Sequence, residues 1–156
     1  MKPWTAAPML GFAILAVLQT SAQAAQSAIA APMHNVKNCK AIDGDTLRCG
    51  SVRVRLVGID AAELPGHCRT GRTCAEGDPY RQREALAQLS ANPLTIVPLK
   101  LDKYQRIIAR IRNARGQDLS CAMLAAGATY RPDWDEGKII ARTCPSQAKG
   151  NRARSE

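Results

Sequence analysis

Hydrophobic and polar positions alternate with a period of two in a segment near the start of the predicted domain. Val52, Val54 and Leu56 alternate with Arg53 and Arg55, so an extended chain places the apolar side chains on one face and the arginines on the other. Asp-Gly at positions 43–44 and Gly-Ser at positions 50–51 are turn sequences that separate this segment from its neighbours. Residues 36–57 are therefore expected to form three strands.

The rest of the chain predicts two helices and two more strands. Asp78 before Pro79 is a helix start, and the helix is expected to reach residue 90; Asp118 begins a second helix that Gly127 ends. Residues 94–101 and 107–111 favour strands, residues 64–77 favour a long loop, and the signals fade beyond Pro132. This order predicts an α+β, mainly β fold: a five-stranded Greek-key barrel with two or three helices.

The first 24 residues have the layout of a secretory signal peptide. Lys2 precedes an apolar run at residues 9–18, and Ala22-Gln23-Ala24 offers a cleavage pattern, although a retained anchor is an alternative. No later segment is apolar enough to cross a bilayer. We expect a secreted or periplasmic protein with a short linker at residues 25–35, one domain at 36–145 and a flexible basic tail at 146–156.

The chain carries a formal net charge of +9, which becomes about +8 once residues 1–24 are removed. An excess of positive charge attracts polyanions, so nucleic acid or an anionic surface is the expected partner. Many secreted proteins are basic for solubility alone, and a protein targeted to an anionic envelope surface is one alternative function. Neither a stable protein partner nor a membrane is expected, and a monomer is the default.

An even number of cysteines in an exported domain predicts disulfides. Six cysteines allow 15 connectivities, and proximity along the chain favours three pairs. These pairs are Cys39–Cys49, Cys68–Cys74 and Cys121–Cys144. A metal site formed by His67, Cys68 and Cys74 is an alternative, but it has no second Cys/His pair at ligand spacing.

Three segments concentrate the polar groups that phosphodiester chemistry needs. They are Asp43-Gly44-Asp45, the stretch that holds Arg55, Asp60 and Glu63, and Asp102-Lys103-Tyr104-Gln105-Arg106. Two carboxylates near strand ends can share a hard cation, and arginine forks grip phosphate oxygens from different sides. A glutamate beside them can orient or deprotonate water. Each group alone has an ordinary interpretation as a turn residue or a solvated charge.

At these residues the chain resembles the staphylococcal nuclease (thermonuclease) family. The resemblance spans residues 36–131 and depends on four motifs in order: Ile-Asp-Gly-Asp-Thr at 42–46, Val-Arg-Leu at 54–56, Gly-Ile-Asp at 58–60 with Glu63, and Asp-Lys-Tyr at 102–104 with Arg106. It implies an OB-fold barrel and calcium-dependent cleavage of DNA and RNA with little sequence preference.

The resemblance also implies a role for each matching residue. Asp45 and Asp60 would bind Ca²⁺ through carboxylates, and Ala61 through its backbone carbonyl. Glu63 would act as the general base or position the water.

Two arginines, Arg55 and Arg106, would neutralise the phosphate in the transition state. Lys103 and Tyr104 would lie near the scissile nucleotide or a terminal phosphate.

The chain departs from the family pattern at two turns. Ala61-Ala62 stands where a small polar residue and proline are common, and Gln105 stands where glycine is usual. A catalytically silent, exported nucleic-acid-binding barrel therefore remains the alternative function. Tyr130 and Trp134 are interpreted as packing residues in preference to base-stacking platforms.

Overall fold

The computed structural model describes residues 32–152, so the predicted signal peptide lies outside the described residues. The strands are β1 (Met33–Val36), β2 (Cys39–Ala41), β3 (Thr46–Cys49), β4 (Val52–Leu56), β5 (Ile59–Asp60), β6 (Leu94–Leu101), β7 (Ile107–Asn113) and β8 (Thr129–Tyr130). The helices are α2 (Pro79–Leu89), α3 (Leu119–Ala125), α4 (Ile139–Thr143) and α5 (Pro145–Gly150), with 3-10 turns η1 (Pro132–Trp134) and η2 (Glu136–Lys138). No helix within residues 32–152 is long and apolar enough to span a membrane.

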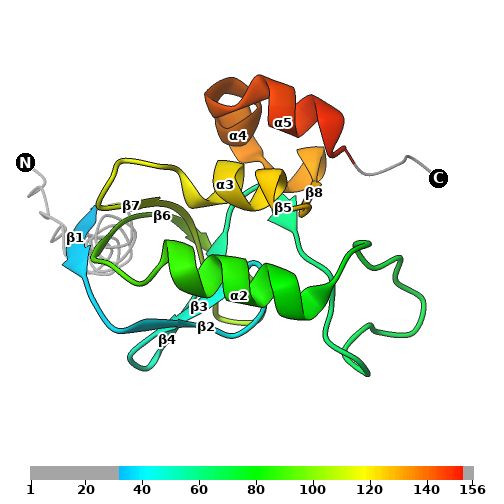
Figure 1. The fold of residues 1–156 in the computed structure, drawn as a ribbon, viewed down its shortest axis with the longest axis horizontal. Coiled ribbons are helices and arrows are strands. Elements are labelled where there is room, and N and C mark those ends of the chain that lie inside the picture. Colours follow the sequence, from blue (N-terminus) through cyan, green and yellow to red (C-terminus); the bar gives the residue numbers. More distant parts are fainter. Residues whose placement is uncertain (1–31, 153–156) are drawn as a thin grey trace, which may run out of the picture.

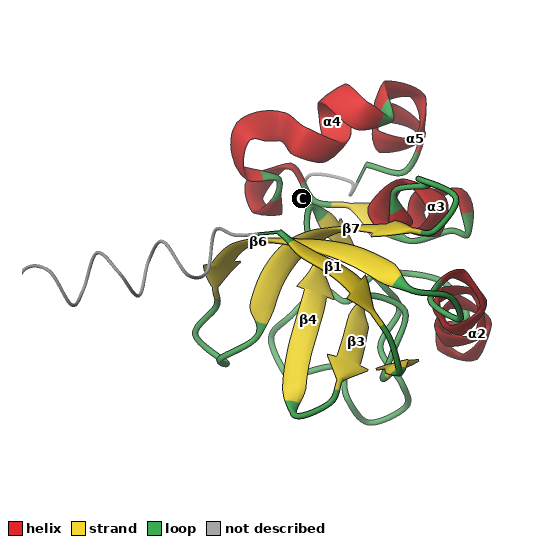
Figure 2. Cartoon of the chain, turned by 90° about the vertical axis from the view of Figure 1, so that its left-hand side faces the viewer, coloured by secondary structure: helices red, strands yellow, loops and turns green. Residues whose placement is uncertain are grey.

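Six strands form one strongly curled sheet in the order β1-β6-β7-β4-β3-β2 (Figure 2). Neighbours are antiparallel except β4 and β7, which are parallel, and β5 pairs with β8 in a separate two-stranded sheet. The prediction of an α+β, mainly β fold is confirmed. The predicted count of five strands is wrong.

Three additional strands do not stand out in the sequence pattern because they are short or irregular. β1 occupies residues expected to be linker, and its pairing with β6 is shifted between Met33 and Val36. Asn35 has a positive φ of 55°, so side chains along β1 do not follow a regular alternation. β5 and β8 contain two residues each, too few to show any period.

In β4, alternation places two of the three apolar side chains in the core, as expected. Val54 and Leu56 are buried beneath the curled sheet, together with Leu94 and Ile96 of β6. Val52 is an exception, because it lies at the open end of β4 and is 40% exposed. Each Å² of apolar surface removed from water stabilises the fold by about 25 cal/mol. The apolar side chains on this inner face therefore provide the main stabilisation of the sheet.

Both predicted helix starts are confirmed by their caps. The Asp78 carboxylate accepts from the backbone N–H groups of Tyr80 and Arg81, with Pro79 in the first turn. Asp118 accepts in the same way from Ser120 and Cys121. α2 and α3 cover one side of the sheet, and α4 and α5 lie beyond α3 (Figure 1). Gly127 follows α3 with a φ of 92°, as a residue ending a helix requires.

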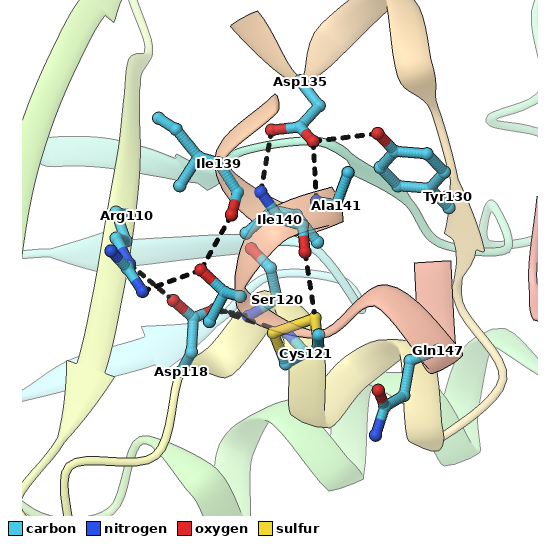
Figure 3. The surroundings of a disulfide bond; sticks show 12 residues. Arg110, Asp118, Ser120, Cys121, Tyr130, Asp135, Ile139, Ile140, Ala141 and Gln147 are labelled. Atoms are coloured by element: carbon cyan, nitrogen blue, oxygen red, sulfur yellow. Dashed lines mark hydrogen bonds and ion pairs between the residues drawn. A yellow bond between two sulfur atoms is a disulfide. The ribbon is translucent and has the colours of Figure 1, made fainter. Parts of the chain in front are cut away.

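The segment after Pro132, where sequence signals fade, is ordered around a buried carboxylate. Asp135 accepts hydrogen bonds from the Tyr130 hydroxyl (2.9 Å) and from the backbone N–H groups of Ile140 and Ala141 (3.0 Å each) (Figure 3). α5 occupies the first part of the predicted flexible tail and buries Ala148. These hydrogen bonds join residues five or six positions apart, a spacing that no helix or strand period indicates.

All three predicted disulfides are present: Cys39–Cys49, Cys68–Cys74 and Cys121–Cys144. The first joins the outer hairpin, the second closes a loop between β5 and α2, and the third ties α3 to the end of α4 (Figure 3). No cysteine is free, so Cys68 and Cys74 are not available to the alternative metal site. Three disulfides indicate folding in an oxidising compartment.

Gln82 is a buried side chain that ties three segments together. Its Oε1 accepts from the N–H of Ala62 (2.7 Å), and its Nε2 donates to the carbonyl of Gly127 (2.9 Å). Gly44 also packs on it, since a Cβ at Gly44 would lie 2.8 Å from the Gln82 Cβ. α2 thereby positions the chain that follows β5.

Replacing Gln82 by alanine is expected to lower the free energy of unfolding by about 1–3 kcal/mol, because the buried N–H of Ala62 and the part-buried carbonyl of Gly127 lose their partners. Urea unfolding of the oxidised protein measures the change. Gln88→Ala, on the exposed side of α2, is the matched control and should change stability by less than about 0.5 kcal/mol. Equal effects of the two substitutions would show that Gln82 is not a structural anchor.

Candidate active site

A cleft of about 800 Å³ opens where β4 and the segments around residues 63–72, 100–108 and 133–134 meet. It is lined by seven basic side chains and four acidic ones. The basic residues are Arg53, Arg55, Arg69, Arg72, Lys100, Lys103 and Arg106, and the acidic ones are Asp43, Glu63, Asp102 and Asp133. This excess of positive charge makes the cleft an anion-binding surface.

The structure brings the predicted site residues together in two layers. Arg55, Glu63, Lys103, Tyr104 and Arg106 line the cleft. The three expected metal ligands lie in a second layer, where Asp45, Asp60 and Ala61 are all buried. Five residues expected to touch substrate therefore share one surface, and those expected to hold the ion lie outside its lining.

Arg55 is placed by the alternation of β4, which turns it away from the core beneath the sheet. Its Nη1 donates to Asp45 at 2.6 Å, and its Nη2 donates to Asp60 at 3.0 Å and to the carbonyl of Ile59 at 3.2 Å. The guanidinium is almost buried, and a buried charge persists only when paired and hydrogen-bonded. Arg55 thus joins the end of β3 to the end of β5.

Asp60 is completely buried and receives donors from three arginines. Besides Arg55, Arg72 reaches both of its oxygens at 2.8 Å, and Arg131 donates to Oδ2 at 3.0 and 3.3 Å. Neither Arg72 nor Arg131 was among the residues that the sequence predicts for the site. No local signal identifies either residue, because they lie 12 and 71 positions from Asp60.

Asp45 is bonded on both of its oxygens. Oδ1 accepts from Arg55 and from the Thr46 hydroxyl (2.8 Å), and Oδ2 accepts from the N–H of Ala61 (3.0 Å). Burial is the largest influence on this carboxyl and raises its pKa to about 6, although Arg55 acts in the opposite direction. Asp45 works here as a structural acceptor that fixes Arg55 and the backbone after β5.

The donor set in this arrangement does not fit a calcium ion. Ca²⁺ takes six to eight oxygen ligands at about 2.3–2.6 Å, whereas the oxygens of Asp45 and Asp60 face guanidinium and N–H donors. Within residues 32–152, no three His, Cys, Asp or Glu side chains are grouped to hold a metal. In this structure the two carboxylates predicted to bind calcium are therefore paired with positive side chains of the protein.

The opposite wall of the cleft is organised by Asp102. Its Oδ2 accepts from Nε of Arg106 at 2.7 Å, and its Oδ1 accepts from the backbone N–H groups of Tyr104 and Arg106. Desolvation acts against the charged form, but the hydrogen bonds from Arg106 and Tyr104 prevail and lower the pKa of Asp102. A fixed carboxylate thus holds the Arg106 guanidinium in place.

Tyr104 lies among cationic side chains on the same wall. Arg69 Nη1 is 2.6 Å from its hydroxyl, and the Arg69 and Arg106 guanidinium carbons are 4.7 and 5.3 Å from its ring centre. The Lys103 ammonium is 5.2 Å from the ring. Such cation–π contacts orient the ring while part of it stays exposed to the cleft.

Trp134 covers the guanidinium groups around Asp60. Arg55, Arg131 and Arg72 lie 5.1, 5.3 and 5.6 Å from the centre of its ring. The residue is 39% exposed and lines the cleft, so it is more than a packing residue at the end of a barrel. The segment that presents it, η1, follows directly after Arg131.

The two departures from the family pattern have visible structural consequences. The N–H of Ala62 donates to Gln82, a bond that a proline at this position would lack, so the turn before Glu63 is pinned by a side chain instead of a ring. Gln105 has a positive φ of 59°, in the region that glycine adopts without strain. The Asp102 hydrogen bonds hold this turn despite the cost.

Comparison of the chain with protein-family models and with curated proteins finds no match in either case.

Tyr104 is expected to ionise at a lower pH than Tyr130. Desolvation raises the pKa of Tyr104, but Lys103 and Arg69 outweigh it, so the net shift is downward. Burial and the hydrogen bond to Asp135 raise the pKa of Tyr130 to about 12. The fold is therefore stabilised by protonated Tyr130 below about pH 10, and this contribution is lost as the pH rises through about 12.

Phenolate absorbance near 295 nm, followed as the pH is raised, measures both steps. Tyr104→Phe should remove an early step and Tyr130→Phe a late one. The reverse assignment would contradict the electrostatic description of the cleft.

Proposed function

We propose that the cleft binds and hydrolyses phosphodiester bonds of DNA and RNA, in an exported protein with the OB-fold of the staphylococcal nuclease family. The observation that carries this proposal is that Arg55, Glu63 and Arg106, from three separate segments, line one cleft. Of the other residues that the resemblance assigns to the site, Lys103 and Tyr104 line the cleft, and Asp45 and Asp60 are bonded to Arg55.

The proposed chemistry uses positioning and charge. A phosphodiester in the cleft meets Arg106 on one wall and Arg55 on the other, and forked donors suit the equatorial phosphate oxygens. Glu63 lies at the rim and accepts from Arg72 at 3.0 Å, which orients its carboxylate. From there it directs or deprotonates a water molecule for attack on phosphorus. Arginines that are already fixed by Asp45, Asp60 and Asp102 need no rearrangement as charge develops.

The proposed substrate is a nucleic acid recognised through its backbone. The basic side chains of the cleft bind phosphates without reading bases. Tyr104 and Trp134 offer partly exposed aromatic faces on which unpaired bases can stack, with little dependence on sequence. Lys103, beside Tyr104, is suited to a phosphate at the end of the bound segment.

A catalytically silent nucleic-acid-binding protein is the second candidate. It is favoured by the ion pair between Glu63 and Arg72, which holds the proposed base against a positive charge. The same basic cleft would then bind single strands and release them intact. The two candidates differ in the fate of the substrate.

Incubation of the oxidised mature protein with single-stranded DNA and RNA, with Ca²⁺ and with a chelator, tests the proposal. Shortening of the strands in either condition supports hydrolysis, whereas retention without cutting supports the silent binder. Cutting that stops in chelator would support the calcium dependence that the family resemblance implies.

Glu63→Gln and Arg106→Ala should each lower the rate of hydrolysis by about 10²-fold or more, since each removes a group that acts on the reacting phosphate. Glu84→Gln on α2 and Arg48→Ala on β3 are exposed and outside the cleft, and they serve as matched controls. Parent-like rates in either cleft variant would refute the role assigned to that residue. Far-UV circular dichroism establishes that the variants remain folded.

A further inference from the structure

Arg72 lies between the carboxylates of Asp60, a predicted calcium ligand, and Glu63. Arg55 lies between Asp60 and Asp45, the other predicted carboxylate ligand. The Nη2 of Arg72 contacts both oxygens of Asp60 at 2.8 Å, and its Nη1 contacts Glu63 at 3.0 Å. One guanidinium therefore bridges a completely buried acid and an acid at the rim of the cleft. Bridging of carboxylates is what a divalent ion does in an oxygen-lined site.

The ion pairs of this cluster match carboxylates and guanidinium groups in number, and Asp43 is a further acid that acts on Asp45 and Arg55. Three carboxylates (Asp45, Asp60 and Glu63) are paired with three guanidinium groups (Arg55, Arg72 and Arg131). A divalent cation is attracted by an excess of negative charge, and here it would meet three positive groups within a few ångströms. Coulomb repulsion between such neighbours disfavours the ion for as long as Arg72 stays in place.

Several contacts hold Arg72 where it is. The Cys68–Cys74 disulfide closes the loop that carries it, and within this loop the N–H of Arg72 donates to the carbonyl of Arg69 (3.1 Å). Arg131 donates to the carbonyl of Thr73 at 3.2 Å, which ties the loop to the chain after β8. The Trp134 ring lies over the guanidinium. The loop is consequently a fixed part of the site.

The same guanidinium also faces the cleft. The side chain of Arg72 is 34% exposed and forms part of the lining. A guanidinium has five N–H groups, and three contacts to carboxylate oxygens are made here, so donors remain for a phosphate oxygen. It can thus neutralise a bound phosphate as a metal ion would, through hydrogen bonds instead of coordination.

We propose that Arg72 is a built-in cation: it replaces the divalent metal of this site and lets the cleft bind phosphodiesters without Ca²⁺. This inference rests on the proposed phosphodiester function for its substrate, but the statement about Ca²⁺ concerns the protein alone. It also assigns Arg72 to substrate binding, beyond the residues that the family resemblance names.

Calcium titration of the oxidised mature protein by calorimetry tests whether Arg72 takes the place of a bound Ca²⁺ ion. No binding at submillimolar Ca²⁺ is expected for three proteins: the parent, Arg72→Lys and the control Arg69→Gln. The control lacks a different guanidinium of the same loop. Arg72→Gln frees two carboxylates of a positive partner and should bind Ca²⁺ at least about tenfold more tightly than the parent. Submillimolar binding by the parent, or no gain in folded Arg72→Gln, would overturn the proposal.

Thermal unfolding of the parent provides a measurement that does not depend on a variant. A ligand that binds only the folded state raises the midpoint of unfolding. The midpoint of thermal unfolding should be the same in millimolar Ca²⁺ as in millimolar Mg²⁺. A specific rise with Ca²⁺ would refute the built-in cation.

Binding of a short fluorescent single-stranded oligonucleotide in the presence of chelator tests whether the cleft binds phosphodiesters without Ca²⁺. The parent should bind, and Arg72→Gln should bind about tenfold more weakly, because a charge-assisted contact is lost. Absence of binding until Ca²⁺ is added would contradict the inference.

The two proposals fail in different ways. Binding in chelator without hydrolysis under any condition refutes the hydrolase and leaves the built-in cation standing. Hydrolysis by a parent protein that binds and requires Ca²⁺ refutes the built-in cation and supports the hydrolase.

Discussion

The site is organised around the carboxylate of Asp60, which is completely buried and bonded to three guanidinium groups. Breaking a buried ion pair by removing one partner costs about 3–5 kcal/mol, because the other charge stays behind in a medium of low polarity. Arg55, Arg72 and Arg131 come from β4, the disulfide loop and the chain after β8. Folding of these three segments is thus coupled to the pairing of one acid.

The cluster around Asp60 and the opposite wall of the cleft follow the same physical rule. Two arginines that face the cleft are held by acids behind them: Arg55 by Asp45 and Asp60, and Arg106 by Asp102. Within residues 32–152, every buried side-chain nitrogen or oxygen has a hydrogen-bond partner. Such fixed donors bind an anion without first having to be ordered, which favours tight binding of phosphate.

The stability of this arrangement comes from the scaffold around it. The curled sheet buries Val54 and Leu56 on one side of β4 and presents Arg55 on the other. Gln82 and the disulfides fix the loops that the sheet itself leaves undefined. A loop such as residues 64–77, which has few apolar residues, is held mainly by covalent and polar contacts. That is why an arginine within it can serve the site.

Local sequence patterns determined the central strands, both helix starts and the three disulfides, because alternation, capping residues and short cysteine spacings act between near neighbours. They also identified Arg55 and Arg106 by residue type and place. Tertiary structure alone decided that Arg72 and Arg131 meet Asp60, and that β1 and β8 join the sheets. Those contacts join positions far apart in the chain, and which carboxylate an arginine pairs with depends on the three-dimensional path between them. For the same reason, only the fold shows that the two aspartates predicted to bind a cation, Asp45 and Asp60, have guanidinium partners.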